Sequence, residues 1–152
     1  MAKRVKTGDI LQILTSKGVA YAQVTHRHPD YGFLIRVFFG FREQRPKDFS
    51  AVVEGELQFS AFFPVQTAVN QGLLSVAGHA PVPEPLQAFP VFRARAGGPG
   101  GSLWLWDGVK EHRLDREFSL QEQAFPTRGI ISAPLLLERI EKNYRAHTHE
   151  FW

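Results

Sequence analysis

The chain has 152 residues, a formal net charge of +3 and no cysteine, and its 13 Phe, 3 Trp and 3 Tyr could furnish an aromatic β core. This length favours a single domain, residues 1–152, that folds without a metal, and the absence of cysteine excludes disulfides. No apolar run approaches the roughly 20 residues of a membrane helix and no signal-peptide core is present, so we expect a soluble, cytoplasmic protein.

The positive charge is concentrated at the N-terminus, in a basic tail that we assign to residues 1–7. Lys3, Arg4 and Lys6 precede the first strand pattern, and subtracting these three from the 18 basic residues leaves 15, which equals the number of acidic residues. A phosphate-binding footprint needs a basic excess on the folded surface, so the neutral remainder argues against nucleic-acid binding.

The first half of the chain reads as a series of strands. Apolar runs at 10–14 and 19–25 flank the turn residues 15–18 and predict a β-hairpin, and a loop is expected at 26–30. The segment 31–41 alternates Phe33, Ile35 and Val37 with Leu34 and Arg36, which predicts a central or strongly curved strand. A charged loop at 42–48 and a further strand at 57–63 follow.

The stretch 72–92 organises the middle of the chain. One or two helical turns are expected at 64–71, followed by a short strand at 73–77. Pro81, Pro83, Pro85 and Pro90 then fix the backbone and remove amide donors, which predicts an extended segment that crosses from one set of strands to another.

The second half predicts a hairpin and a final helix. Strands are expected at 91–95, 103–106 and 109–114, with Asp107-Gly108 as the tight turn between the last two. Ser132 can cap a C-terminal helix over 133–146, whose apolar stripe is Leu136, Leu137, Ile140 and Tyr144. The fold class is therefore mainly β (α+β by strict count), with a strongly curved antiparallel sheet or small barrel packed by one C-terminal helix.

Two groups of glycine, proline and apolar residues form a pattern along the chain. The first is Gly8-Asp9-Ile10, Gly18 and Tyr21-Ala22-Gln23-Val24, and the second is Gly72, an apolar strand, Gly78, Pro81 and Pro90-Val91-Phe92. This pattern resembles the immunity protein 26 family of bacterial polymorphic toxin systems. The family commonly has a tryptophan where this chain has Leu74. The resemblance implies a protein that binds a cognate toxin and neutralises it in the cytoplasm, and it transfers no functional residue because the matched positions look structural.

Loop carboxylates and one tryptophan pair are the candidate partner-binding residues. Acidic side chains suit a basic toxin such as a nuclease. The carboxylates are Asp30, Glu43, Asp48, Glu54 and Glu56. Trp104 and Trp106 share one face of their strand; such a pair is more often core, but on a free sheet face it would anchor a partner.

A small nucleic-acid-binding β-barrel is the alternative function. In that interpretation basic side chains track a phosphate backbone while nearby aromatic rings stack on bases. The basic residues are Arg36, Arg42, Arg45 and Lys47, and the aromatic residues are Tyr31, Phe38 and Phe41.

Metal binding and catalysis have less support from the sequence. His26, His28 and Asp30 form the best ligand group, and a second group is His147, His149 and Glu150. Structural zinc sites usually need four ligands and catalytic ones three, and neither group has an identifiable partner ligand. There is no cysteine and no Gly-x-Ser-x-Gly motif, so we expect no enzyme, no catalytic residue, no metal and no cofactor.

Overall fold

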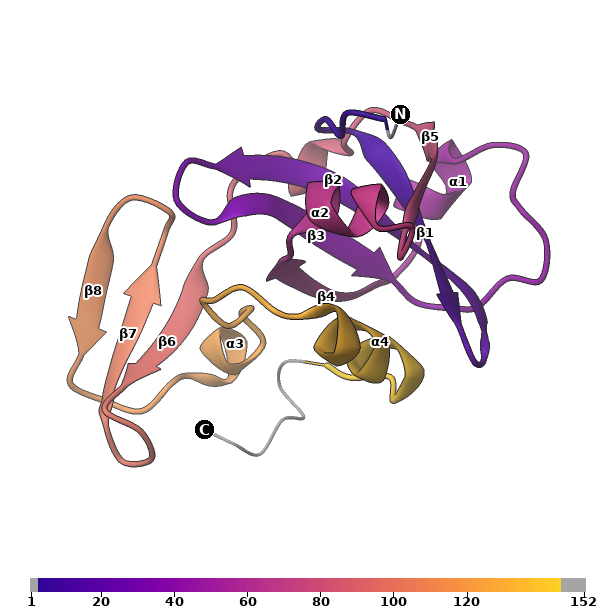
Figure 1. Cartoon of the computed structure of the whole chain (residues 1–152). Coiled ribbons are helices and arrows are strands. Elements are labelled where there is room, and N and C mark those ends of the chain that lie inside the picture. Colours follow the sequence, from indigo (N-terminus) through magenta and orange to yellow (C-terminus); the bar gives the residue numbers. More distant parts are fainter. Residues whose placement is uncertain (1–2, 146–152) are drawn as a thin grey trace.

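Two antiparallel sheets form the computed structural model, which describes residues 3–145 (Figure 1). The first sheet has the order β4-β3-β2-β1-β5 and the second the order β6-β7-β8. The strands are β1 (Asp9–Thr15), β2 (Gly18–His28), β3 (Gly32–Phe38), β4 (Leu57–Phe62), β5 (Ser75–His79), β6 (Phe92–Ala96), β7 (Ser102–Trp106) and β8 (Glu111–Leu114). The helices are α1 (Ser50–Val53), α2 (Val65–Asn70), α3 (Leu120–Gln123) and α4 (Ala133–Glu141), with a 3-10 turn η1 (Glu84–Leu86).

The mainly β prediction is confirmed, and the five-stranded sheet is curved without closing into a barrel. None of the helices within residues 3–145 combines the length and the apolar character needed to span a bilayer.

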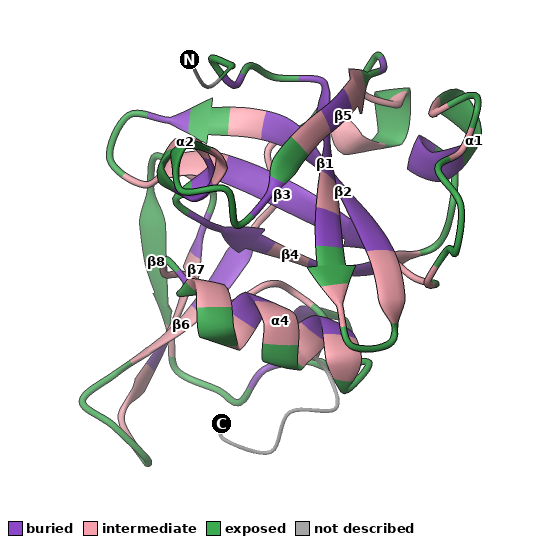
Figure 2. Cartoon of the chain, turned by 45° about the vertical axis from the view of Figure 1, so that its right-hand side comes forward, coloured by how far each residue is buried: buried purple, intermediate pink, exposed green. Residues whose placement is uncertain are grey.

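Alternation along β3 explains why this sheet is buried on both faces. Ile35 and Val37 are fully buried in a core under α4, together with Leu136 and Ile140 of that helix (Figure 2). Phe38 points to the opposite face, where it packs with Val52 of α1 in a second cluster. The central-strand prediction for this segment is therefore confirmed, with β3 between β2 and β4.

A third cluster joins the two sheets. Phe62 of β4 stacks on Phe92 of β6, with ring centroids 5.0 Å apart and an interplanar angle of 16°. Leu34 and Trp106 complete the buried set. The proline-rich segment 81–91 carries the chain from β5 to β6 between the sheets, as the sequence predicts.

Several residues that carry the family resemblance have structural positions. Asp9 is completely buried, accepts the Lys6 amide at 3.0 Å and lies 3.1 Å from Nδ1 of His79. A Cβ at Gly78 would lie 2.6 Å from the Phe49 ring, so only glycine allows this close approach. Both positions therefore serve the packing of the β1–β5 edge.

Several sequence-based boundaries need correction. Strand β3 ends at Phe38 rather than at 41, and β5 spans Ser75–His79 rather than 73–77. Strand β2 continues through His28, because a register shift between Val24 and His26 lets pairing with β3 resume beyond the expected loop start. The last hairpin turns over residues 107–110, where the Asp107 amide donates to the Lys110 carbonyl at 3.1 Å.

The C-terminal helix ends at Glu141 rather than at 146. Asn143 has φ of 54°, the Tyr144 amide donates to the Arg139 carbonyl at 2.9 Å, and the Asn143 amide donates to the Ile140 carbonyl at 3.3 Å. This pair of bonds is a Schellman motif, which stops the helix and turns the following residues back toward the sheet.

Candidate functional site

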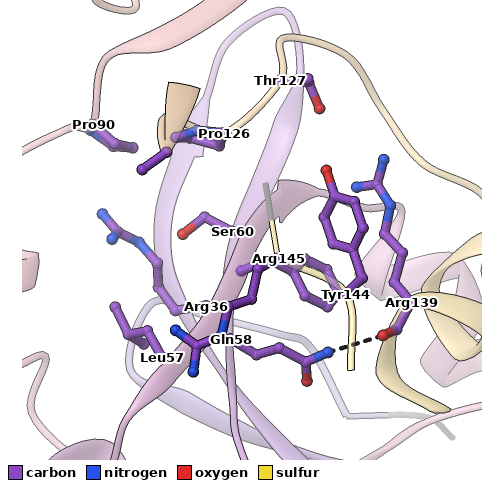
Figure 3. A pocket seen from close by; sticks show the side chains of 12 residues that line it. Arg36, Leu57, Gln58, Ser60, Pro90, Pro126, Thr127, Arg139, Tyr144 and Arg145 are labelled. Carbon is purple, nitrogen blue, oxygen red and sulfur yellow. Dashed lines mark hydrogen bonds between the residues drawn. The ribbon is translucent and has the colours of Figure 1, made fainter. Parts of the chain in front are cut away.

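A pocket of about 270 Å³ opens beside β4, the edge strand of the larger sheet (Figure 3). Five separate segments meet there: β3, β4, the end of the proline-rich crossing, the loop after α3, and the end of α4. Twelve residues line it, and we call the site the arginine pocket. They are Arg36, Leu57, Gln58, Phe59, Ser60, Pro90, Ala124, Pro126, Thr127, Arg139, Tyr144 and Arg145.

Two local irregularities shape the arginine pocket. The β3–β4 register shifts between Val37 and Phe38, which leaves Gln58 as an extra residue in β4. The Gln58 side-chain amide donates to the Arg139 carbonyl at 2.8 Å and so ties the edge strand to the last turn of α4. The Schellman motif at the helix end then places Tyr144 and Arg145 on the pocket wall.

Arg36 is the most unusual residue of the pocket. It is only 8% exposed, its Nε is buried without a hydrogen-bond partner, and no described residue forms an ion pair with it. Its neighbours in the strand register are Gln23 and Ser60, which are neutral and cannot balance its charge. Burial lowers the pKa of Arg36 to about 10, so the guanidinium is still protonated at neutral pH.

The field of this guanidinium reaches the neighbouring strand. The pKa of His26 is lowered chiefly by burial; the hydrogen bond to the Gln87 carbonyl opposes this effect, and the positive charge of Arg36 adds to it. Among the described residues, then, Arg36 disfavours the protonated form of His26 and has no anionic partner.

Two more arginines line the pocket, and aromatic rings hold both. The Arg139 guanidinium lies 4.3 Å from the Tyr144 ring centroid, and its Nε is also buried with no hydrogen-bond partner in the described part of the chain. Arg145 lies 4.1 Å from the Phe39 ring centroid and forms an ion pair with Glu56 at 2.7 Å. No acidic residue is among the twelve that line the pocket, so the lining charge is entirely positive.

The chemistry of these groups suits binding and not proton transfer. Guanidinium groups stay charged near neutral pH and donate hydrogen bonds, but they cannot act as a general base. Ser60, Thr127 and Tyr144 supply the hydroxyl groups of the lining, and none of the described lining residues is a histidine or a carboxylate that could activate them.

The predicted acidic residues occupy two separate places. Glu43, Asp48, Glu54 and Glu56 are exposed on the β3–β4 connection, whereas Asp30 lies in the β2–β3 turn at the other end of the sheet. Asp48 accepts hydrogen bonds from the Ser50 amide and hydroxyl, which lower its pKa. Four of the five predicted carboxylates therefore lie on one connection, and one of these four, Glu56, is already paired with Arg145.

The tryptophan pair splits between core and surface. Trp106 is 3% exposed in the aromatic cluster between the sheets, so it is a core residue and not a partner contact. Trp106 is buried because its end of β7 packs against the larger sheet. Trp104 is partly exposed, and its indole Nε1–H donates to the Ser102 hydroxyl at 2.9 Å.

The histidine group of β2 has a structural role. Nδ1 of His28 accepts the amides of Asp30 and Tyr31 at 3.1 and 3.3 Å, which leaves Nε2–H to donate to the Gly108 carbonyl at 2.7 Å. His26 contacts the Thr25 hydroxyl and the Gln87 carbonyl. Within residues 3–145, no group of three or more His, Asp or Glu side chains could hold a metal. His147, His149 and Glu150 lie outside the described residues.

The residues expected to form a nucleic-acid surface do not share one. Phe38 is buried at 4% exposure and Tyr31 packs against Trp106 in the aromatic cluster. Arg36 faces the arginine pocket, whereas Arg42 and Lys47 are exposed on the β3–β4 connection and Arg45 lies over the Phe49 ring. Only Phe41, which is partly exposed, remains near the loop cations.

Comparisons with protein-family models, curated proteins and solved structures found no match to this chain. The arginine pocket and the motif residues are therefore the features that bear on function.

Proposed function

We propose that this chain is a bacterial immunity protein that binds a cognate toxin in the cytoplasm and neutralises it by covering the toxin's active site. The observation that carries the proposal is Arg36, a cation at 8% exposure without a counter-charge among the described residues, facing an open pocket. Buried charges in proteins are normally paired. An unpaired one at an opening supports the binding of an oppositely charged group from another molecule.

The composition of the pocket supports a binding function over an enzymatic one. Its charged groups are guanidiniums, and its hydroxyl groups have no base among the lining residues. Such a site attracts and orients an anion, but it has no group that takes up a proton in a reaction near neutral pH.

The resemblance to the immunity protein 26 family suggests that the partner is a toxin. The residues that carry the resemblance lie mainly on the β1–β2 hairpin and around β5, so they support a shared scaffold. The exposed carboxylates Glu43, Asp48 and Glu54 on the β3–β4 connection add a surface that can steer a basic toxin.

Co-expression tests the proposal directly. The C-terminal domain of the large secreted protein expected from the gene immediately upstream is expressed in a bacterial host, alone and with this chain. We expect growth arrest by the domain alone, recovery of growth with the chain, and co-purification of the pair. Unrelieved arrest without co-purification would overturn the proposal, and so would turnover of a small substrate by the purified chain.

A further inference from the structure

We infer that the arginine pocket receives the carboxylate of an aspartate or glutamate side chain, carried by an extended segment of the toxin that lies along the outer edge of β4. The inference rests on the proposed function for the identity of the partner. The residues that line the pocket determine the chemistry of the anion.

Two buried N–H groups in the pocket need an acceptor. They are the Nε–H groups of Arg36 and Arg139, and neither has a hydrogen-bond partner among residues 3–145. A carboxylate is a suitable acceptor, because it is acceptor-only, carries a negative charge and has about four lone-pair sites on two oxygens. Arginine and carboxylate also match in geometry, since the planar guanidinium can donate two parallel hydrogen bonds.

The size of the pocket limits the ligand. At about 270 Å³ it is below the range of roughly 300–1,000 Å³ typical of sites for drug-sized ligands. One acidic side chain needs far less room than a nucleotide. Leu57, Pro90 and Pro126 supply apolar wall for its methylene groups.

The edge of β4 explains how such a side chain would be presented. At one end of this edge, the Ile131 amide donates to the Phe62 carbonyl at 3.0 Å, so the chain itself pairs with the strand there. Residues 57–60 of the same strand line the pocket instead. An extended segment can add to an exposed strand edge through main-chain hydrogen bonds, and its alternate side chains then enter adjacent pockets.

The first experiment uses glutarate, a small dicarboxylate, as the probe on the full-length chain. Calorimetric titration at constant ionic strength should show millimolar binding that weakens at least about tenfold in Arg36→Met, the loss expected when a charge-assisted hydrogen bond is removed. Arg42→Met is the matched control, because Arg42 is an exposed cation outside the pocket. Circular dichroism verifies that both variants fold.

Three results of the titration would overturn the inference. The first is equal glutarate binding by the unmodified chain and Arg36→Met. The second is tighter binding of inorganic phosphate or a thymidine oligonucleotide at the same residue, which would assign the site to a phosphate. The third is glutarate binding that tightens at least about tenfold in Glu150→Gln, because the chain's own C-terminal segment would then be the competing occupant.

The second experiment identifies the source of the carboxylate, with a control outside the acidic β3–β4 connection. Arg36→Met should lose affinity for the toxin domain at least about tenfold and protect growth less well, whereas Arg113→Met, which removes an exposed cation of β8 outside the pocket, should match the unmodified chain. If Arg36→Met loses glutarate binding but keeps full toxin affinity, the inference is overturned and the proposed function stands. If the unmodified chain gives no protection, the proposed function fails, and the titration shows separately whether the pocket binds a carboxylate.

Discussion

Replacing Arg36 with methionine should make the unliganded protein more stable. Arg36 keeps its charge at neutral pH although burial lowers its pKa to about 10, from an ordinary value above 12. At 1.36 kcal/mol for each pH unit, this fall corresponds to about 3 kcal/mol of unfavourable free energy in the folded state. Methionine keeps most of the apolar stem and removes the charge, so we expect a net stabilisation of roughly 1–3 kcal/mol.

Thermal and urea denaturation measure this effect. For a chain of this length 1 kcal/mol corresponds to about 2–4 °C, so the Tm of Arg36→Met should rise by roughly 2–12 °C. The pKa of Arg36 is lower in the folded state than in the unfolded state. The free-energy cost of burying the charge is therefore fully present below about pH 10 and disappears as the pH rises above both pKa values.

Arg42→Met is the control for nonspecific effects of the substitution. Arg42 is exposed, so its replacement should change the stability by no more than about 0.5 kcal/mol. A clear loss of stability in Arg36→Met, with Arg42→Met unchanged, would show that Arg36 is paired in the native protein. That result would refute the reasoning behind the pocket.

Three further predictions concern titration and helix capping. In Arg36→Met the pKa of His26 should rise but stay below its ordinary value, because burial is the larger cause of its shift; an NMR titration with an unchanged pKa would contradict this. Ser119→Ala should cost about 1 kcal/mol in urea denaturation, because Ser119 forms a capping box with Glu122, whereas Ser119→Asp should retain most of the stability. Hydrogen bonds from Arg116 and the Ser119 amide lower the pKa of Glu122 to about 2. The stabilisation that the ionised Glu122 gives to the folded state should therefore be present above pH 4.5 and be lost as the pH falls toward 2. If Glu122→Gln lost as much stability in acid as the unmodified chain, Glu122 would not be the cause of that loss.

The strands were predictable because their apolar periodicity survives in the fold. Ile35 and Val37 lie on one face of β3 and Leu34 on the other, as the alternation in the sequence indicates. The sequence also marks the start of α4, where Ser132 accepts the Leu135 amide at 3.3 Å. The end of that helix was missed because an asparagine, Asn143, takes the left-handed position that glycine most often fills.

Helix α3 was missed although its capping residues are local in the sequence. Ser119 and Glu122 have the spacing of a capping box, which is a sequence-level sign of a helix start. The arginine pocket had no comparable local sign. Arg36, Pro90 and Arg145 come from distant segments, and only the folded topology brings them to one strand edge.

The burial of Trp106 likewise depended on tertiary packing. The sequence places Trp104 and Trp106 on one face of a strand, but it does not indicate where a second sheet will dock. His28 helps to fix that docking, since its ring donates to the Gly108 carbonyl in the β7–β8 turn.

The division into two sheets also bears on how the chain reaches its native state. Strands β1 to β4 and strands β6 to β8 each pair with their neighbours along the chain, whereas β5 returns to β1. Neighbouring pairs close short loops and form quickly, while distant contacts carry a larger loop-closure entropy. We therefore expect each meander to take shape early, with the stacking of Phe62 on Phe92 as a late, rate-limiting event.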